Sequence, residues 1–119
     1  MQYKRMEIYM VNLGLKMGSV QGGIKPCVVI SNDVGNEYST ILKVIPLTSK
    51  KFDRDKPMPT HVVIEKGIGN LRTNSIAMCE QEQTISQSQI QFKIGKLENQ
   101  GLIKQIEDCM MIALGIVTR

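Results

Sequence analysis

The chain has 119 residues, which corresponds to one domain over residues 1–119 and is too short for two. Apolar residues make up 42% and charged residues 22%, a balance typical of a folded protein and not of a disordered one. The longest nearly unbroken apolar run covers only residues 110–117, whereas a membrane span needs about 20, and the N-terminus has no signal-peptide core. The sequence therefore predicts a cytoplasmic protein without a membrane segment.

Positive charge is concentrated in the first half of the chain. Residues 1–59 hold nine basic and five acidic side chains, while residues 60–119 hold six of each. Such a local excess indicates an anionic partner and is compatible with nucleic acid. A chance imbalance on a solvated surface explains this excess equally well.

Short strand-like segments follow one another along most of the chain. They cover residues 6–12, 26–31, 41–48, 60–65, 74–80 and 91–97. Strands this short, at intervals of roughly 8–15 residues, favour a small antiparallel barrel over alternating strands and helices.

The final segment has the periodicity of a helix. Asn99 is a candidate N-cap, and Gly115 allows the helix to end. The apolar stripe comprises Leu102, Ile106, Cys109, Ala113 and Val117, and it is widened by Ile103, Met110 and Leu114. A stripe of this width is typical of a core or a subunit interface, and a shorter helical turn is expected at 86–90.

Two loops separate the early strands. Residues 13–25 contain four glycines, and residues 49–59 contain six charged residues, two prolines and Phe52. The second segment is too polar to be buried, so we expect a surface loop there.

Cysteine and histidine usage excludes several kinds of site. Cys27, Cys79 and Cys109 are odd in number and lie in apolar surroundings, which predicts buried thiols in a reducing compartment. Without a CxxC pair, and with His61 as the one histidine, the sequence favours no structural zinc site and no metal ligand set. We expect a structural or strand-edge role for His61.

Gly22, Gly23, Lys25 and Pro26 form a pattern suited to phosphate. Adjacent glycines let the backbone approach a ligand, and a lysine beside exposed amides places a cation there. Pro26 holds Lys25 in an extended conformation. Because glycine turns before strands are common, these residues alone favour the simpler interpretation of a turn.

Six blocks in order along the chain resemble the MazF/PemK toxins of bacterial toxin–antitoxin systems. They are KRxEIY at 4–9, GSxQGGxKP at 18–26, ISNDxGN at 30–36, PLTS at 46–49, PTHV at 59–62 and CEQxxTI at 79–85. With the terminal helix, the resemblance covers about residues 4–116.

The resemblance implies a mainly β fold, a small SH3-like antiparallel barrel of the CcdB/Kid/MazF type with a C-terminal helix. It implies a homodimer that cuts single-stranded RNA at specific sequences, needs no metal or other cofactor, and leaves a 2′,3′-cyclic phosphate and a 5′-hydroxyl. It also implies a cognate antitoxin peptide that covers the RNA groove, and DNA binding together with that antitoxin.

The site residues carried over by the resemblance are few. Lys25 takes the place of a catalytic arginine, Thr48 that of a catalytic threonine, and Gln81 that of a glutamine lining the RNA site. A cation at position 25 suits stabilisation of the crowded, anionic phosphorane that forms when RNA is cleaved. Loop aromatics such as Phe52 suit recognition of unstacked bases. The expected RNA-binding residues are Arg5, Ser19, Gln21, Gly22, Gly23, Phe52 and Gln81.

Several positions depart from the family pattern, and three of them bear on a phosphate site. Lys25 offers a point charge where the family has a planar arginine fork, and Gln83 and Gln89 stand where basic residues are frequent. This loss of charge keeps a second interpretation open, in which the chain is a weakened, non-enzymatic RNA binder or a gyrase-directed toxin on the same fold.

Overall fold

The computed structural model of the chain describes residues 2–49 and 58–117. The described strands are β1 (Glu7–Asn12), β2 (Ile24–Val29), β3 (Ile41–Thr48), β4 (His61–Ile64), β5 (Ser75–Met78), β6 (Gln83–Ser86) and β7 (Ile90–Lys96). Two α-helices, α1 (Asp33–Tyr38) and α2 (Gln100–Ala113), accompany three short 3₁₀ turns, η1 (Ile68–Asn70), η2 (Cys79–Gln81) and η3 (Gln87–Gln89).

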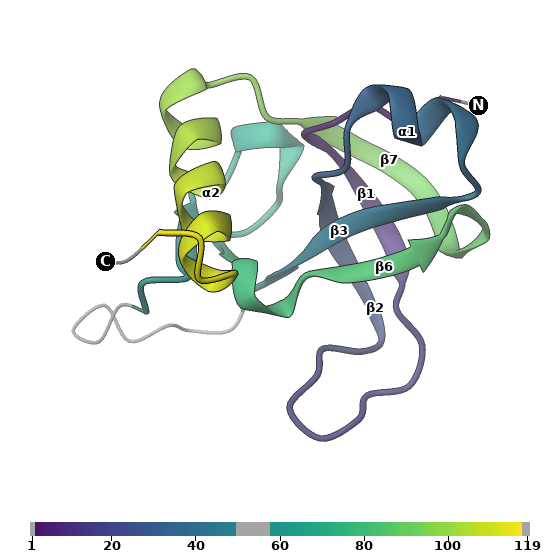
Figure 1. Cartoon of the computed structure of the whole chain (residues 1–119), viewed down its shortest axis with the longest axis horizontal. Coiled ribbons are helices and arrows are strands. Elements are labelled where there is room, and N and C mark those ends of the chain that lie inside the picture. Colours follow the sequence, from purple (N-terminus) through teal and green to yellow (C-terminus); the bar gives the residue numbers. More distant parts are fainter. Residues whose placement is uncertain (1, 50–57, 118–119) are drawn as a thin grey trace.

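The strands form one antiparallel sheet in the order β4-β5-β3-β2-β1-β7, with β6 paired to β3. The long strand β3 connects three neighbours, because its beginning pairs with β6, its middle with β2 and its end with β5. The sheet therefore curves strongly around β3 (Figure 1). The predicted mainly β fold with a terminal helix is confirmed, and the hydrogen-bonded path through the described strands ends at β4 and β7 without closing.

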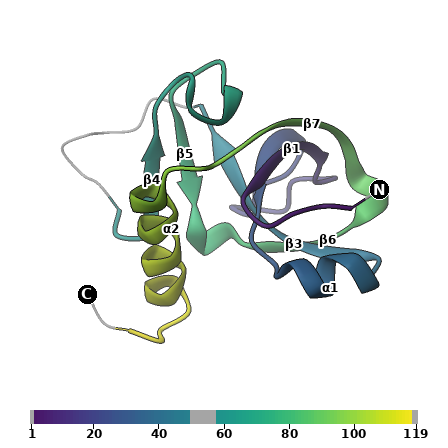
Figure 2. The ribbon, with the colours of Figure 1, turned by 90° about the horizontal axis from the view of Figure 1, so that it is seen from above.

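Helix α2 begins and ends where the sequence predicts. The Asn99 side chain accepts a hydrogen bond from the Leu102 N–H at 3.0 Å, and Gly115 follows the helix with a φ of 74°. Leu102 and Ile106 are buried, and the helix contacts β4 and η2 (Figure 2). Within the described residues, no helix has the length and apolar character needed to cross a membrane.

Two hydrophobic clusters stabilise the curved sheet. One includes Ile8, Ile45 and Ile106 and lies beneath α2, while the other includes Tyr9 and Val44. Burial of apolar side chains of this kind is the main source of folding free energy.

The three thiols differ in burial. Cys27 and Cys79 are buried, as expected, and burial raises the pKa of each thiol to about 12. Cys109 is only half-buried, because it lies on α2 at the margin of the core.

His61 is the first residue of β4, which is an edge strand of the described sheet. Its Nε2 lies 2.7 Å from Glu80 Oε1, and the Thr60 hydroxyl donates to the other oxygen of that carboxylate at 2.8 Å. The predicted strand-edge position of His61 is confirmed.

Candidate functional site

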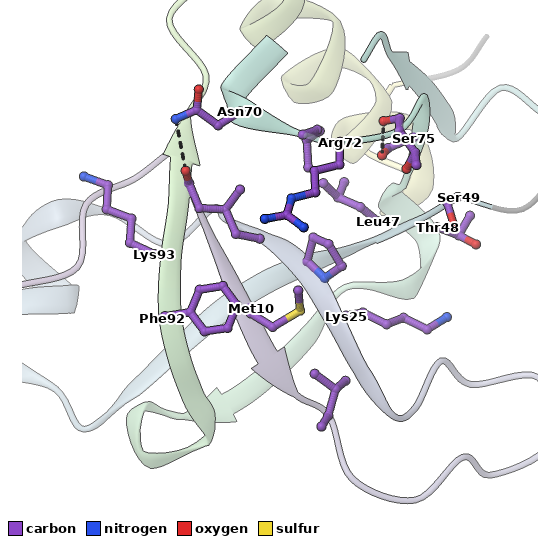
Figure 3. A pocket seen from close by; sticks show the side chains of 15 residues that line it. Met10, Lys25, Leu47, Thr48, Ser49, Asn70, Arg72, Ser75, Phe92 and Lys93 are labelled. Atoms are coloured by element: carbon purple, nitrogen blue, oxygen red, sulfur yellow. Dashed lines mark hydrogen bonds between the residues drawn. The ribbon is translucent and has the colours of Figure 1, made fainter. Parts of the chain in front are cut away.

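A pocket of about 740 Å³ opens on the sheet and brings together residues that are far apart in sequence. Strands β1, β2, β3 and β7 contribute to its lining, and the connection between β4 and β5 contributes residues 70–73. Figure 3 shows the side chains that surround it. Its volume lies within the range of about 300–1,000 Å³ that is usual for small-molecule sites.

Lys25 and Thr48, the two predicted catalytic residues, both line this pocket. Strands β2 and β3 pair antiparallel, with Cys27 opposite Pro46. Lys25 lies two residues before Cys27 on β2, and Thr48 lies two residues after Pro46 on β3, where β3 pairs with β5 and no longer with β2. Strand pairing therefore places an ammonium group and a hydroxyl group at the same end of the pocket.

The charged side chains that line the pocket are all positive. They are Lys25, Arg72 and Lys93, and none of the described lining residues is Asp or Glu. Such a lining attracts an anionic ligand. The rest of the surface is largely apolar, with Met10, Phe92 and other side chains of β1, β2 and β7.

One of these cations has a carboxylate partner just outside the pocket. Lys93 Nζ lies 2.5 Å from Oε2 of the buried Glu7. Burial of Glu7 opposes ionisation, but hydrogen bonds from Lys93, the Tyr9 hydroxyl and the Lys4 N–H outweigh it and lower the pKa of this carboxyl group. Glu7 therefore holds Lys93 on β7 and compensates part of its charge.

The glycine-rich loop between β1 and β2 closes tightly beside Lys25. The Gly23 N–H donates to Gly14 O at 2.7 Å, and the Leu13 N–H donates to Gly23 O at 2.8 Å. A Cβ atom at Gly22 would lie 2.6 Å from the Lys16 backbone, and Gly23 has a φ of 78°. Both positions therefore need glycine, which explains the Gly-Gly pair as a requirement of the loop.

Gln81, the last residue of η2, attaches this loop to the segment between β5 and β6. Its Oε1 accepts from the Gln21 N–H at 3.2 Å, and its Nε2 donates to Ser19 O at 3.0 Å. Gln83 Nε2 also donates to Gln21 O at 2.8 Å. The Gln21 side chain in turn accepts a hydrogen bond from Lys25 Nζ. These contacts link Gln81 to the ammonium group of Lys25 through Gln21.

The structure separates Arg5 from the other expected RNA-binding residues. Its guanidinium donates to Glu107 on α2 at 2.8 Å and to Ile30 O at 3.2 Å, and it lines a different surface hollow. Phe52 lies outside the described residues. Of the expected set, Lys25 and Thr48 line the pocket. The others lie in the glycine-rich loop beside Lys25 or are bonded to that loop, and do not line the pocket: Ser19, Gln21, Gly22, Gly23 and Gln81.

Arg72, Phe92 and Lys93 line the pocket but were not expected from the sequence. Arg72 lies in the connection between β4 and β5 and belongs to no recognisable motif. Phe92 and Lys93 fall in the predicted strand 91–97, where an aromatic residue next to a basic one was the only sequence feature that indicated a binding surface. Their proximity to Lys25 depends on the pairing of β7 with β1 and of β1 with β2.

Comparison with known proteins finds relatives in one family. Residues 4–114 match the family described as a PemK-like, MazF-like toxin of type II toxin–antitoxin systems. A curated relative, the endoribonuclease MazF of Staphylococcus saprophyticus subsp. saprophyticus, is 35% identical over 115 residues, which cover 97% of this chain and 93% of the relative.

Solved structures share the fold at lower identity. MazF from Deinococcus radiodurans superposes with a TM-score of 0.80 at 16% identity and covers 97% of this chain and 98% of its own. A mycobacterial endoribonuclease in complex with its cognate antitoxin has a TM-score of 0.78 at 18% identity, with coverage of 98% and 99%.

Proposed function

The chain belongs to the family of PemK-like and MazF-like toxins of type II toxin–antitoxin systems, and we propose that it is an endoribonuclease that cuts single-stranded RNA. In this proposal it acts in the cytoplasm on messenger RNA at specific sequences, without a metal ion. The observation that carries the proposal is that Lys25 and Thr48 line one pocket whose charged lining residues are all basic.

The reaction proposed is attack of a ribose 2′-hydroxyl on the adjacent phosphate. A bond forms between the 2′-oxygen and phosphorus, the bond to the 5′-oxygen breaks, and the products are a 2′,3′-cyclic phosphate and a 5′-hydroxyl. The phosphorane that precedes cleavage carries extra negative charge, which a preorganised cation and hydrogen-bond donors stabilise. Lys25 supplies this cation from β2, and Thr48 supplies a hydroxyl donor from the end of β3.

Proton transfer completes the reaction. The Lys25 ammonium donates a proton to the departing 5′-oxygen and is reprotonated by water. The proton of the 2′-hydroxyl passes to water, because no described residue lining the pocket is an acid or a histidine. Gln81 and Gln21 act as positioning residues, since they hold the loop from which Lys25 is oriented.

Cleavage of a long RNA, followed by primer extension with EDTA present, tests this function. Cuts at a recurrent short sequence, with a cyclic phosphate on one product end, support it. A parent protein that binds RNA but leaves it intact contradicts it and favours a non-enzymatic binder, and RNA-independent inhibition of gyrase favours the gyrase-directed alternative. The parent protein itself must be tested for cleavage, because it has a lysine at position 25 where the family has an arginine.

We also propose a homodimer that is inhibited by an acidic antitoxin peptide. Apolar side chains remain exposed at the end of α2, with Leu114 62% and Ile116 66% exposed, and a second copy would cover them. The basic pocket suits an acidic, disordered peptide. Sedimentation at micromolar protein in which only a monomer is present would contradict the dimer.

A further inference from the structure

Arg72 enters the pocket from a segment that has no part in the proposed catalytic pair. It belongs to the connection between β4 and β5, and Figure 3 shows its guanidinium directed into the pocket, with Met10 and Phe92 across from it. Lys25 and Thr48 lie toward another side of the same pocket. A second cationic position therefore faces the cavity.

The backbone that carries Arg72 is held firmly in place. Leu71 is 5% exposed and packs in the main hydrophobic cluster. The Asn70 side chain donates to Ile94 O on β7 at 3.1 Å. Gly69 lies so close to β7 that a Cβ atom on Gly95 would come within 2.3 Å of its carbonyl oxygen. Because the backbone at Arg72 is fixed, only its side chain has to be ordered when a ligand binds.

Arg72 also differs from Lys93 in its surroundings. Lys93 forms an ion pair with Glu7, whereas no ion pair joins Arg72 to an acidic side chain within residues 2–49 and 58–117. Its planar guanidinium can donate two parallel hydrogen bonds to one phosphate. Phe92 is 55% exposed beside it and offers an aromatic surface for a nucleobase.

We propose that Arg72 binds a backbone phosphate next to the one held at Lys25, with the intervening base on Phe92. This inference rests on the proposed function and names a binding residue for its substrate. A basic groove with an aromatic side chain is the chemistry that recognises single-stranded nucleic acid. The arginine fork that is missing at position 25 is then present at the neighbouring subsite.

The test compares Arg72→Gln with Lys66→Gln in the full-length protein. Lys66 lies in the same β4–β5 connection, is exposed and does not line the pocket, so this variant loses the same charge elsewhere. Each variant is titrated with a fully 2′-O-methylated RNA, which cannot undergo attack by a 2′-hydroxyl, over a series of salt concentrations. Thermal unfolding confirms that both variants are folded.

Arg72→Gln is expected to weaken binding about tenfold or more, and to reduce the slope of log affinity against log salt by about 0.7, the value for one contact with single-stranded nucleic acid. Lys66→Gln is expected to keep the parent slope, and Arg72→Lys to restore the slope with only part of the affinity. Equal slopes for Arg72→Gln and Lys66→Gln would overturn the inference, even if the parent cuts RNA. A parent that binds this RNA through Arg72 but cuts none would leave the inference standing and contradict the proposed nuclease.

Discussion

The Oε1 atom of Gln81 accepts a hydrogen bond from the backbone N–H of Gln21, 60 residues earlier in the chain, at 3.2 Å. Gln21 accepts in turn from Lys25 Nζ through its own side chain. Gln81, which the resemblance places in the RNA site, therefore also connects η2 to the glycine-rich loop. Its removal should alter catalysis through the position of Lys25.

Gln81→Ala is expected to reduce the cleavage rate by up to about 10²-fold, because small displacements of a catalytic group are costly. The loop should also become more accessible to protease near residues 14–21. The rate is measured at saturating RNA, and limited proteolysis reports on the loop.

Gln105→Ala is the matched control for this variant, because it removes the same side chain from an exposed position on α2. It should leave both the cleavage rate and the proteolysis pattern unchanged. An unchanged loop combined with a strong loss of RNA affinity in Gln81→Ala would mean that Gln81 contacts RNA directly and does not act through Gln21.

Gly95→Ala is expected to destabilise the protein by about 1–3 kcal/mol, as overpacking does elsewhere. The reason is the contact of 2.3 Å that a Cβ atom would make with Gly69 O. Chemical denaturation measures the free energy of unfolding. Gly101→Ala in α2 serves as a control, because an added Cβ atom there would meet only the side-chain oxygen of Asn99, at 3.2 Å, and alanine favours a helix over glycine by about 1 kcal/mol. If the two variants were equally stable, β7 and η1 would move apart at little cost to make room for the added methyl group.

Much of the fold could be predicted from the sequence because its elements have strong local signals. Strand β3 and the start of α2 follow directly from apolar patterning and the Asn99 cap. Helix α1 was missed because Asp33–Tyr38 is a short polar segment with a central glycine. Strand β6 was missed because only Ile85 among its residues is buried, so no alternation was visible.

The residues that line the pocket were predictable only where a motif marks them. Lys25 and Thr48 belong to family motifs, and the fold brings both into the lining of one pocket. Arg5 also belongs to a motif, but its guanidinium bonds to Glu107 away from the pocket. Arg72 carries no motif and reaches the pocket only through tertiary structure, which a single sequence does not show.

The buried carboxylate of Glu7 predicts a specific loss of stability in acid. Its pKa is lowered from an ordinary value of 4.5, so the unfolded chain binds this proton more readily than the folded one. The stability contributed by Glu7 should be present above pH 4.5 and be lost as the pH falls through the folded pKa. The free energy of unfolding, measured between pH 7 and pH 3, checks this.

Glu7→Gln should be less stable than the parent at pH 7 and should lose less stability on acidification. Glu98→Gln removes the carboxylate of an exposed pair with Lys96, and such pairs contribute little. Parallel pH profiles for Glu7→Gln and the parent would show that another group governs acid unfolding.

An acidic antitoxin peptide is expected to compete with RNA for the basic pocket. Charge attraction to Lys25, Arg72 and Lys93 should make its association rate fall as salt increases. Fluorescence anisotropy of labelled 2′-O-methyl RNA, with peptide added, measures the competition. Simultaneous binding of both ligands with unchanged affinities would show that they use separate surfaces.

The central claim is that Lys25 is the main phosphorane-stabilising cation and that Thr48 assists it. Lys25→Arg should retain or raise activity, since a fork contacts two phosphate oxygens. Thr48→Ala should impair cleavage while the protein stays folded. Lys104→Ala, which removes an exposed lysine paired with Asp108 on α2, is the control for charge and should cut RNA at the parent rate.

The most direct test is the single-turnover rate constant for RNA cleavage by Lys25→Ala, measured beside its affinity for 2′-O-methyl RNA. The rate should fall about 10²-fold or more, as when a key oxyanion donor is removed, and the affinity should fall much less. Cleavage by Lys25→Ala as fast as by the parent would contradict the assignment of Lys25 as the catalytic cation.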